Sequence, residues 1–146
     1  MSAKERFKLP CAVSLLLIRD NKILLLRRCN TGWQDGIYGV PAGHIDGDES
    51  LTDALLREAY EEISITIQAS DAMFAHMTHT KSNKEYLYVY FAVKKWQGEP
   101  YNKEPNKCDR IHWASLDKLP HNTVPVIREA IESYRKGVLY SEDGWR

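Results

Sequence analysis

The sequence predicts a mixed α/β or α+β layer fold in one compact domain. Apolar runs of strand length fill much of the chain, and two segments with the apolar spacing of a helix lie between and after them. At 146 residues, with 43% hydrophobic and 27% charged residues, the chain is long enough to build its own core. The order of the elements does not fit a doubly wound sheet.

The first part of the chain predicts a hairpin followed by irregular structure. Residues 11–18 and 23–28 are apolar strand segments, and Asp20-Asn21 between them is typical of a tight turn. Residues 30–39 form a Gly-rich loop, whose tip is incompatible with regular structure. A short extended piece at residues 37–40 leads to a second loop at residues 44–49.

A helix is expected from about Leu51 to Ile63. Ser50 is a suitable N-cap, and Asp53 three residues later completes an approximate capping box. Apolar residues recur along one side at helical spacing, namely Leu55, Leu56, Ala59 and Ile63.

The rest of the chain predicts further strands and a closing helix. In the strand expected at residues 86–93, residues 86–91 are apolar or aromatic at successive positions, as in a central strand. A last helix over about 123–136 ends at Gly137. The strands are expected at residues 65–67, 73–80, 86–93 and 110–113, with a turn at 81–84 and a polar loop at 97–107.

Charge and cysteine content exclude several classes of protein. Lys plus Arg equals Asp plus Glu, so the chain is not expected to bind a nucleic-acid polymer. Its apolar runs are too short to cross a membrane, and the amino-terminal residues lack a signal-peptide pattern. Cys11, Cys29 and Cys108 are scattered, which fits neither a disulfide framework nor a zinc site. A cytoplasmic protein with reduced thiols is therefore expected.

The segment that indicates chemistry is an acidic cluster on the first helix. Glu58, Glu61 and Glu62 stand at i, i+3 and i+4, so they share one side of the helix and repel one another. Oxygen ligands without Cys or a clear His partner favour Mg²⁺, with Mn²⁺ as a substitute, over zinc. Taken alone, the cluster is also compatible with a solvated acidic helix face.

The surrounding residues make the pattern far more specific. Gly43 is followed after five residues by Glu49, after seven more by Arg57-Glu58, and then by Glu61-Glu62. The stretch from Gly43 to Ile65 resembles the Nudix box at every charged position. It departs once, because Ser64 stands where the family usually has the Gly that ends the helix in a left-handed conformation.

The resemblance implies a Nudix-type α/β/α sandwich with a mixed sheet between helices. Residues 30–44 also look like the entry loop of MutT-like members, so the likeness covers about 10–136 of a single domain at 1–146. In family terms, the carbonyl of Gly43 and the carboxylates of Glu58, Glu61 and Glu62 hold metal ions. Arg57 holds a carboxylate of the cluster, and Glu49 pairs with Arg57 or reaches a further ion.

The general base and the substrate pocket are less specified. In several Nudix enzymes the base lies in a loop before a late strand, where this chain has Glu99 and Glu104, and Glu104 is the better placed. Glu104 also fits as an exposed loop residue. Aromatic side chains that could stack on a base, or simply pack in the core, are Trp33, Tyr38, Phe74 and Tyr86.

Four functions remain open at this point. The first is a MutT-like hydrolase that converts a nucleoside triphosphate to a monophosphate and pyrophosphate. The second is hydrolysis of another diphosphate: a dinucleoside polyphosphate, ADP-ribose or a sugar nucleotide. The third is a catalytically silent ligand sensor, which would not need the intact charged positions of the box. The fourth, an isopentenyl diphosphate isomerase, would need a reactive Cys motif that is not evident. Family members also often form homodimers.

Overall fold

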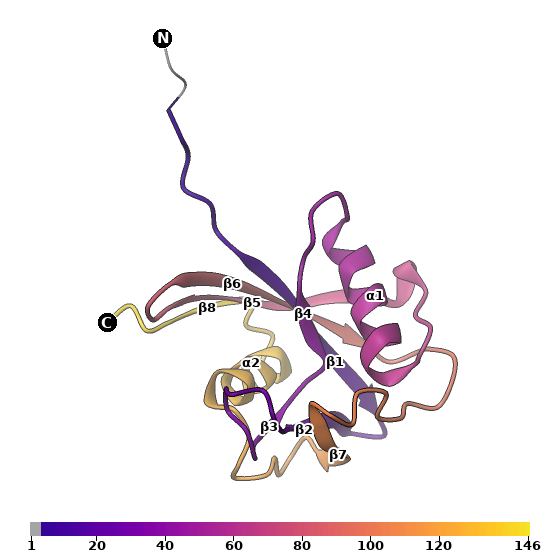
Figure 1. The fold of residues 1–146 in the computed structure, drawn as a ribbon. Coiled ribbons are helices and arrows are strands. Elements are labelled where there is room, and N and C mark those ends of the chain that lie inside the picture. Colours follow the sequence, from indigo (N-terminus) through magenta and orange to yellow (C-terminus); the bar gives the residue numbers. More distant parts are fainter. Residues whose placement is uncertain (1–3) are drawn as a thin grey trace.

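The computed structural model describes residues 4–146 as a mixed sheet between two helices (Figure 1). Helix α1 (Leu51–Ile63) packs on one core cluster and helix α2 (Pro125–Arg135) on another. This confirms the predicted α+β sandwich. Within the described range, no helix has the length and apolar character needed to cross a membrane.

The sheet combines parallel and antiparallel neighbours. Its main order is β3-β2-β1-β6-β5-β8, with β4 paired to β1 and β7 paired to β2. The β1–β6 and β5–β8 pairs are parallel, and the other pairs are antiparallel. The strands are β1 (Cys11–Arg19), β2 (Lys22–Arg28), β3 (Tyr38–Gly39), β4 (Ala42–His44), β5 (Met73–Lys81), β6 (Glu85–Val93), β7 (Cys108–Ser115) and β8 (Tyr140–Asp143); a short 3₁₀ turn covers Ala69–Asp71.

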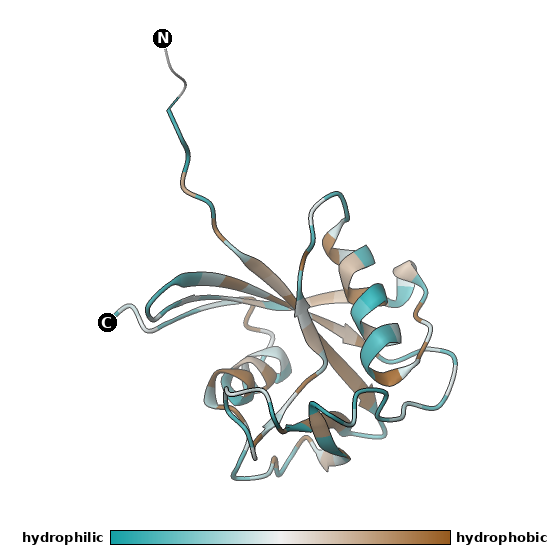
Figure 2. Ribbon diagram, viewed as in Figure 1, coloured by the Kyte–Doolittle hydropathy of each residue, from teal (hydrophilic) through white to brown (hydrophobic). Residues whose placement is uncertain are grey.

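The core lies on both faces of the central strands. On β1, Leu15 and Leu17 belong to the cluster under α1, whereas Leu16 and Ile18 belong to the cluster under α2. Both sets are buried because each face of the sheet is covered by a helix. Figure 2 shows these strands as a hydrophobic centre, while α1 presents hydrophilic residues on its outer side. The predicted central strand at residues 86–93 is β6, between β1 and β5.

Local turn and cap chemistry agrees with the sequence. Asp20 and Asn21 both have positive φ, 53° and 58°, as a tight hairpin turn requires. The Ser50 side chain accepts a hydrogen bond from the Asp53 backbone N–H, so α1 begins where predicted. At its other end, Ser64 adopts φ 59° and ψ 39°, the left-handed conformation that Gly usually supplies at that box position.

Three predicted elements differ from the structure. The strand expected at residues 65–67 is reduced to a single bridge between Thr66 and Gln97, because only one residue on each side pairs. Helix α2 begins at Pro125 instead of residue 123, since Thr123 is bridged to Tyr38. The strand expected at residues 110–113 extends over Cys108–Ser115 along β2.

The carboxyl-terminal segment adds a strand that the sequence pattern did not reveal. It runs parallel to β5, with Tyr140 opposite Met77. Beneath it the fully buried His76 places Nδ1 2.7 Å from the Val138 carbonyl oxygen and Nε2 2.8 Å from the Ser141 hydroxyl. Both polar atoms of the ring are therefore satisfied by this segment.

Candidate active site

The box residues are brought together by the pairing of β4 with β1. This pairing sets Gly43 opposite Val13 and holds the β4 backbone beside helix α1. The Glu58 carboxylate lies so close to Gly43 that a side-chain Cβ there would overlap it. Only glycine therefore permits this approach between the loop and the first glutamate of the cluster.

Arg57 organises the acidic residues around it. Its guanidinium donates to both carboxylate oxygens of Glu49, at 3.1 and 2.7 Å, and to Glu58 Oε1 at 2.8 Å. It also lies 3.3 Å from Asp46 and 3.5 Å from Glu61. Hydrogen bonding to Glu49 raises the pKa of Arg57, so the guanidinium stays charged. The predicted contacts of Arg57 with Glu49 and with the cluster are present.

Glu62 is the most enclosed carboxylate of the cluster. Its Oε2 accepts a 2.9 Å hydrogen bond from the Ala42 backbone N–H. Burial raises its pKa well above the usual range, and the nearby carboxylates of Glu58 and Glu104 raise it further. Glu62 thus carries a negative charge at neutral pH only at a cost in free energy.

Glu58 and Glu61 differ in exposure. Burial raises the pKa of Glu58, although its ion pair with Arg57 acts in the opposite direction. The side chain of Glu61 is 52% exposed, compared with 15% for Glu58. The two differ accordingly in how far their charge is screened by water.

Glu104 comes from a segment distant in sequence and lines one cavity together with Glu58, Glu61 and Glu62. This cavity of about 350 Å³ is lined by Leu26, Arg27, Arg28, Thr31, Gly39, Val40, Ala42, Glu58, Glu61, Glu62, Asn102, Glu104, Lys107 and Cys108. By contrast, Glu99 is exposed and forms a two-point ion pair with Arg19, with both distances 3.1 Å. The structure therefore places Glu104, and not Glu99, with the cluster.

Basic residues stand on the same cavity wall. Arg28, at the end of β2, donates to the Trp33 carbonyl at 2.8 Å and to the Thr31 hydroxyl at 3.1 Å. Its guanidinium also lies 4.9 Å from the centre of the Trp33 ring. Lys107 lines the cavity from the loop that carries Glu104. Arg28 and Asn102 were not among the site residues predicted from the sequence; the one signal for Arg28 was its place between an apolar strand and the Gly-rich loop.

The four aromatic candidates are not gathered at this cavity. Trp33 is 52% exposed on the Gly-rich loop, and Tyr38 is buried in the core under α2, near His112. Phe74 is exposed on β5, and Tyr86 lies beside His44 and Tyr88. None of the four is among the described residues that line the cavity, although the Trp33 carbonyl accepts from Arg28 and Tyr38 pairs with Arg27, which both line it.

The donor set fits a hard divalent cation. Mg²⁺ and Mn²⁺ prefer carboxylate and carbonyl oxygens, and a cation would relieve the repulsion that raises the pKa of Glu62. Within residues 4–146, however, no three His, Cys, Asp or Glu side chains already surround a common point as metal ligands. The Glu58 carboxylate is directed to Arg57. The ligand set of Gly43, Glu58, Glu61 and Glu62 therefore stays a prediction.

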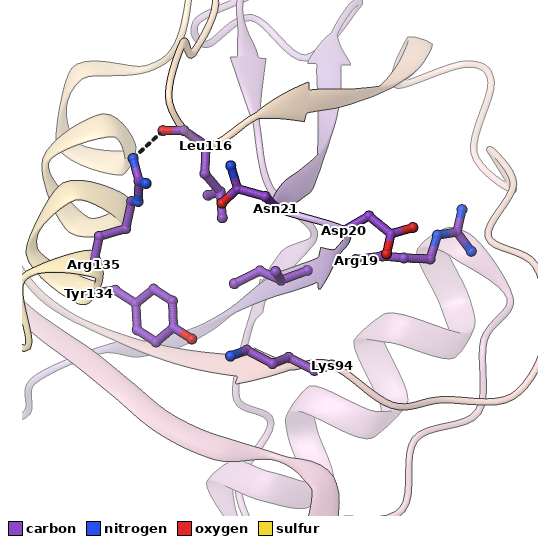
Figure 3. A pocket seen from close by; sticks show the side chains of 8 residues that line it. Arg19, Asp20, Asn21, Lys94, Leu116, Tyr134 and Arg135 are labelled. Atoms are coloured by element: carbon purple, nitrogen blue, oxygen red, sulfur yellow. Dashed lines mark hydrogen bonds between the residues drawn. The ribbon is translucent and has the colours of Figure 1, made fainter.

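A larger cavity, of about 650 Å³, lies at the opposite end of the β1–β2 hairpin (Figure 3). Of the described residues, only Asp20 contributes a carboxylate to its lining. Arg135 donates to the Leu116 carbonyl at 2.7 Å, and Arg19 points away from Arg135 and Tyr134. Without a cluster of acidic groups, this shallow hollow lacks the chemistry found beside α1.

Comparisons with known proteins agree with this geometry. A sequence model described as the NUDIX domain matches residues 8–134. The Phosphatase NudJ of Shigella boydii serotype 4 (strain Sb227) is 26% identical over 137 residues, covering 92% of this chain and 88% of the relative. The MutT NUDIX hydrolase of Burkholderia pseudomallei superposes with a TM-score of 0.79 at 25% identity, covering 86% and 98% of the two chains. A NUDIX hydrolase of Nitrosomonas europaea shares the fold at a TM-score of 0.76 and 24% identity, covering 91% and 93%.

Proposed function

Because the chain belongs to the Nudix hydrolase family, whose members cleave phosphoanhydride bonds, we propose that its substrate is a nucleoside triphosphate or a related nucleoside diphosphate derivative. From a nucleoside triphosphate the products are a nucleoside monophosphate and pyrophosphate. The cofactor is Mg²⁺, for which Mn²⁺ can substitute.

The convergence of Glu58, Glu62 and Glu104 in one cavity carries this proposal. Three partly buried carboxylates that repel one another lower the stability of the folded protein, so their presence is not explained by folding. They suit an enzyme that holds a divalent cation against a diphosphate. Arg28 and Lys107 on the same wall add positive charge for phosphate oxygens. A silent binding module would not need this acidic arrangement.

Each group has a distinct task in the reaction. A divalent cation, when bound, neutralises phosphate charge and lowers the pKa of water. The Gly43 carbonyl, Glu58 and Glu62 would hold that cation, Glu61 would serve as a further ligand or orient a water, and Arg57 fixes the orientation of Glu58. Glu104 accepts a proton from the attacking water at its carboxylate. The water oxygen then bonds to phosphorus, while the bridging P–O bond breaks and pyrophosphate leaves.

The name of one relative supports a second candidate. The Shigella protein is called a phosphatase, a term that favours release of terminal orthophosphate. The same cavity would suffice for either cut, because the position of the attacked phosphorus depends on how the substrate lies. Dinucleoside polyphosphates, ADP-ribose and sugar nucleotides remain alternatives on the same chemistry.

The test is a panel of nucleoside triphosphates, diphosphates and nucleotide conjugates with Mg²⁺, with products identified by mass in ¹⁸O-water. We expect a monophosphate and pyrophosphate, with one ¹⁸O at the attacked phosphorus. Orthophosphate as the first product would support the second candidate instead. Absence of turnover with every compound, with either metal, would support the silent module.

A matched pair of variants identifies the base. Glu104→Gln should lower kcat by about 10²-fold, in the range lost with a general base. Glu99→Gln changes the same residue type in the same connection but at an ion pair outside the cavity, and should leave kcat within about twofold. Equal effects of the two variants would contradict the assignment of Glu104.

A further inference from the structure

We propose that Asn102 is a positioning residue, which fixes the Glu104 backbone so that the Glu104 carboxylate faces the cluster on α1. The inference rests on the proposed role of Glu104. Asn102 lines the same cavity and lies two residues before Glu104. Its side chain does not need to contact the substrate to exert this effect.

The Asn102 side chain joins both ends of the turn that carries Glu104. Its Oδ1 accepts a hydrogen bond from the Glu104 backbone N–H at 3.1 Å. Its Nδ2 donates to the Cys108 carbonyl at 2.6 Å. Only one orientation of the amide satisfies both partners, because a backbone N–H needs an acceptor and a carbonyl needs a donor. The side chain is thus held in a single orientation.

The turn between these two points is closed by its own backbone. The Glu104 carbonyl accepts hydrogen bonds from Lys107 N at 2.9 Å and Cys108 N at 3.0 Å. These bonds shape residues 104–108 as one compact unit. Asn102 is the side chain that links this unit to the chain entering it, so it sets the position of the whole turn.

The flanks of the turn are anchored to the elements that build the active site. Tyr101 N donates to the Ile63 carbonyl and Lys103 N to the Glu62 carbonyl, both at 3.1 Å. At the far side, Cys29 N donates to the Lys107 carbonyl at 2.9 Å. The chain is therefore fixed to the last turn of α1 on one side and to the end of β2 on the other. Between these anchors, Asn102 makes the two side-chain bonds that place Glu104.

Removing both bonds should displace the base without removing it. A misplacement of about 1 Å can cost up to about 10²-fold in rate. We therefore expect Asn102→Ala to lower kcat by about tenfold to a hundredfold with KM within about twofold. Asn102→Ser should recover part of the loss, because a Ser hydroxyl can accept from the N–H two residues later. Asn106→Ala, at an exposed Asn of the same loop, should leave kcat within about twofold.

A double-variant cycle with Glu104→Gln separates this inference from the role of Glu104. If Asn102 acts through Glu104, then Asn102→Ala should cause no further loss of kcat in the Glu104→Gln background. Losses that multiply, or a rise in KM at unchanged kcat, would overturn the positioning role while Glu104 keeps its own. A normal kcat in Glu104→Gln alone would instead overturn the proposed base. Melting temperatures of all variants are measured in parallel, and Asn102→Ser provides the comparison if Asn102→Ala does not fold.

Discussion

Replacing Glu62 by Gln separates the chemistry of the cluster from its effect on stability. Glu62 is the largely buried member of the cluster, and its Oε2 accepts the Ala42 N–H. A Gln side chain has the same length and retains a carbonyl oxygen for that bond, while its amide group can donate toward Glu58. The variant therefore removes a charge and a cation ligand without removing the hydrogen bond to the loop.

The magnitudes follow from these contacts. Losing one charged ligand that acts on the transition state should cost about 3 kcal/mol, which corresponds to a fall in kcat of about 10²-fold or more. Relief from two like-charged neighbours, Glu58 and Glu104, should add roughly 0.5–1 kcal/mol to the free energy of unfolding on the scale of helix pairs. For a chain of this size, that corresponds to a rise in melting temperature of roughly 1–4 °C.

The assay compares turnover with Mg²⁺ and melting temperature in EDTA for the native protein, Glu62→Gln and Asp53→Asn. Asp53 lies on the same helix but is exposed in its first turn, so Asp53→Asn should keep kcat within about twofold. It should lower stability by only a few tenths of a kcal/mol, through the helix dipole. Normal turnover of a folded Glu62→Gln protein would refute the reasoning, because the cluster would then be only a solvated helix face.

Four further outcomes are expected. Hydrolysis should stop in EDTA and return with Mg²⁺ or Mn²⁺, and full activity in chelator would contradict a metal-assisted mechanism. Because the folded-state pKa of Glu62 is raised above its unfolded value, its contribution to stability is present at low pH and is lost as pH rises through the folded pKa. The gain in melting temperature of Glu62→Gln in EDTA should therefore be larger at about pH 8 than at about pH 5, and a constant gain would speak against the burial argument. Gly43→Ala should lower kcat by about tenfold or more, since its Cβ would displace the Glu58 carboxylate; unchanged kinetics would show that the close approach is dispensable. Ser64→Gly should raise stability by about 0.5–1 kcal/mol, measured by urea unfolding, because φ of 59° is strained for Ser; a loss of stability would indicate that the Ser side chain contributes a compensating contact.

Local sequence signals predicted α1 and the hairpin well because the physics there is local. The apolar stripe and the Ser50 cap define α1, and the Asp20-Asn21 pair tolerates the positive φ of the turn. The prediction of a strand at residues 65–67 was wrong because the local sequence pattern does not show whether a neighbouring segment is available for pairing. Ile65 and Ile67 are buried in alternation, as in a strand, but they pack on the core while only Thr66 finds a pairing partner.

Long-range features were predicted less well. β8 consists of Tyr-Ser-Glu-Asp, which has little strand pattern, and it is a strand because β5 offers it a parallel edge. The spacing of the box predicted the side of α1 that carries Glu58, Glu61 and Glu62. The approach of Glu104 to Glu62 depends on hydrogen bonds between residues about forty positions apart in the chain. The sequence could therefore only offer Glu104 and Glu99 as two candidates for the general base.

The burial of His76 decides where the chain can be shortened. A boundary at residue 134, where the family match ends, would remove Val138 and Ser141 and leave two buried ring nitrogens without partners. A ring nitrogen that stays buried without a partner costs about 1–3 kcal/mol. Such a truncation would also turn β5, with its exposed Met73 and Phe74, into an open sheet edge that invites pairing between molecules. Expression should therefore run past Asp143, with any tag placed ahead of residues 4–10, which extend away from the body of the molecule (Figure 1).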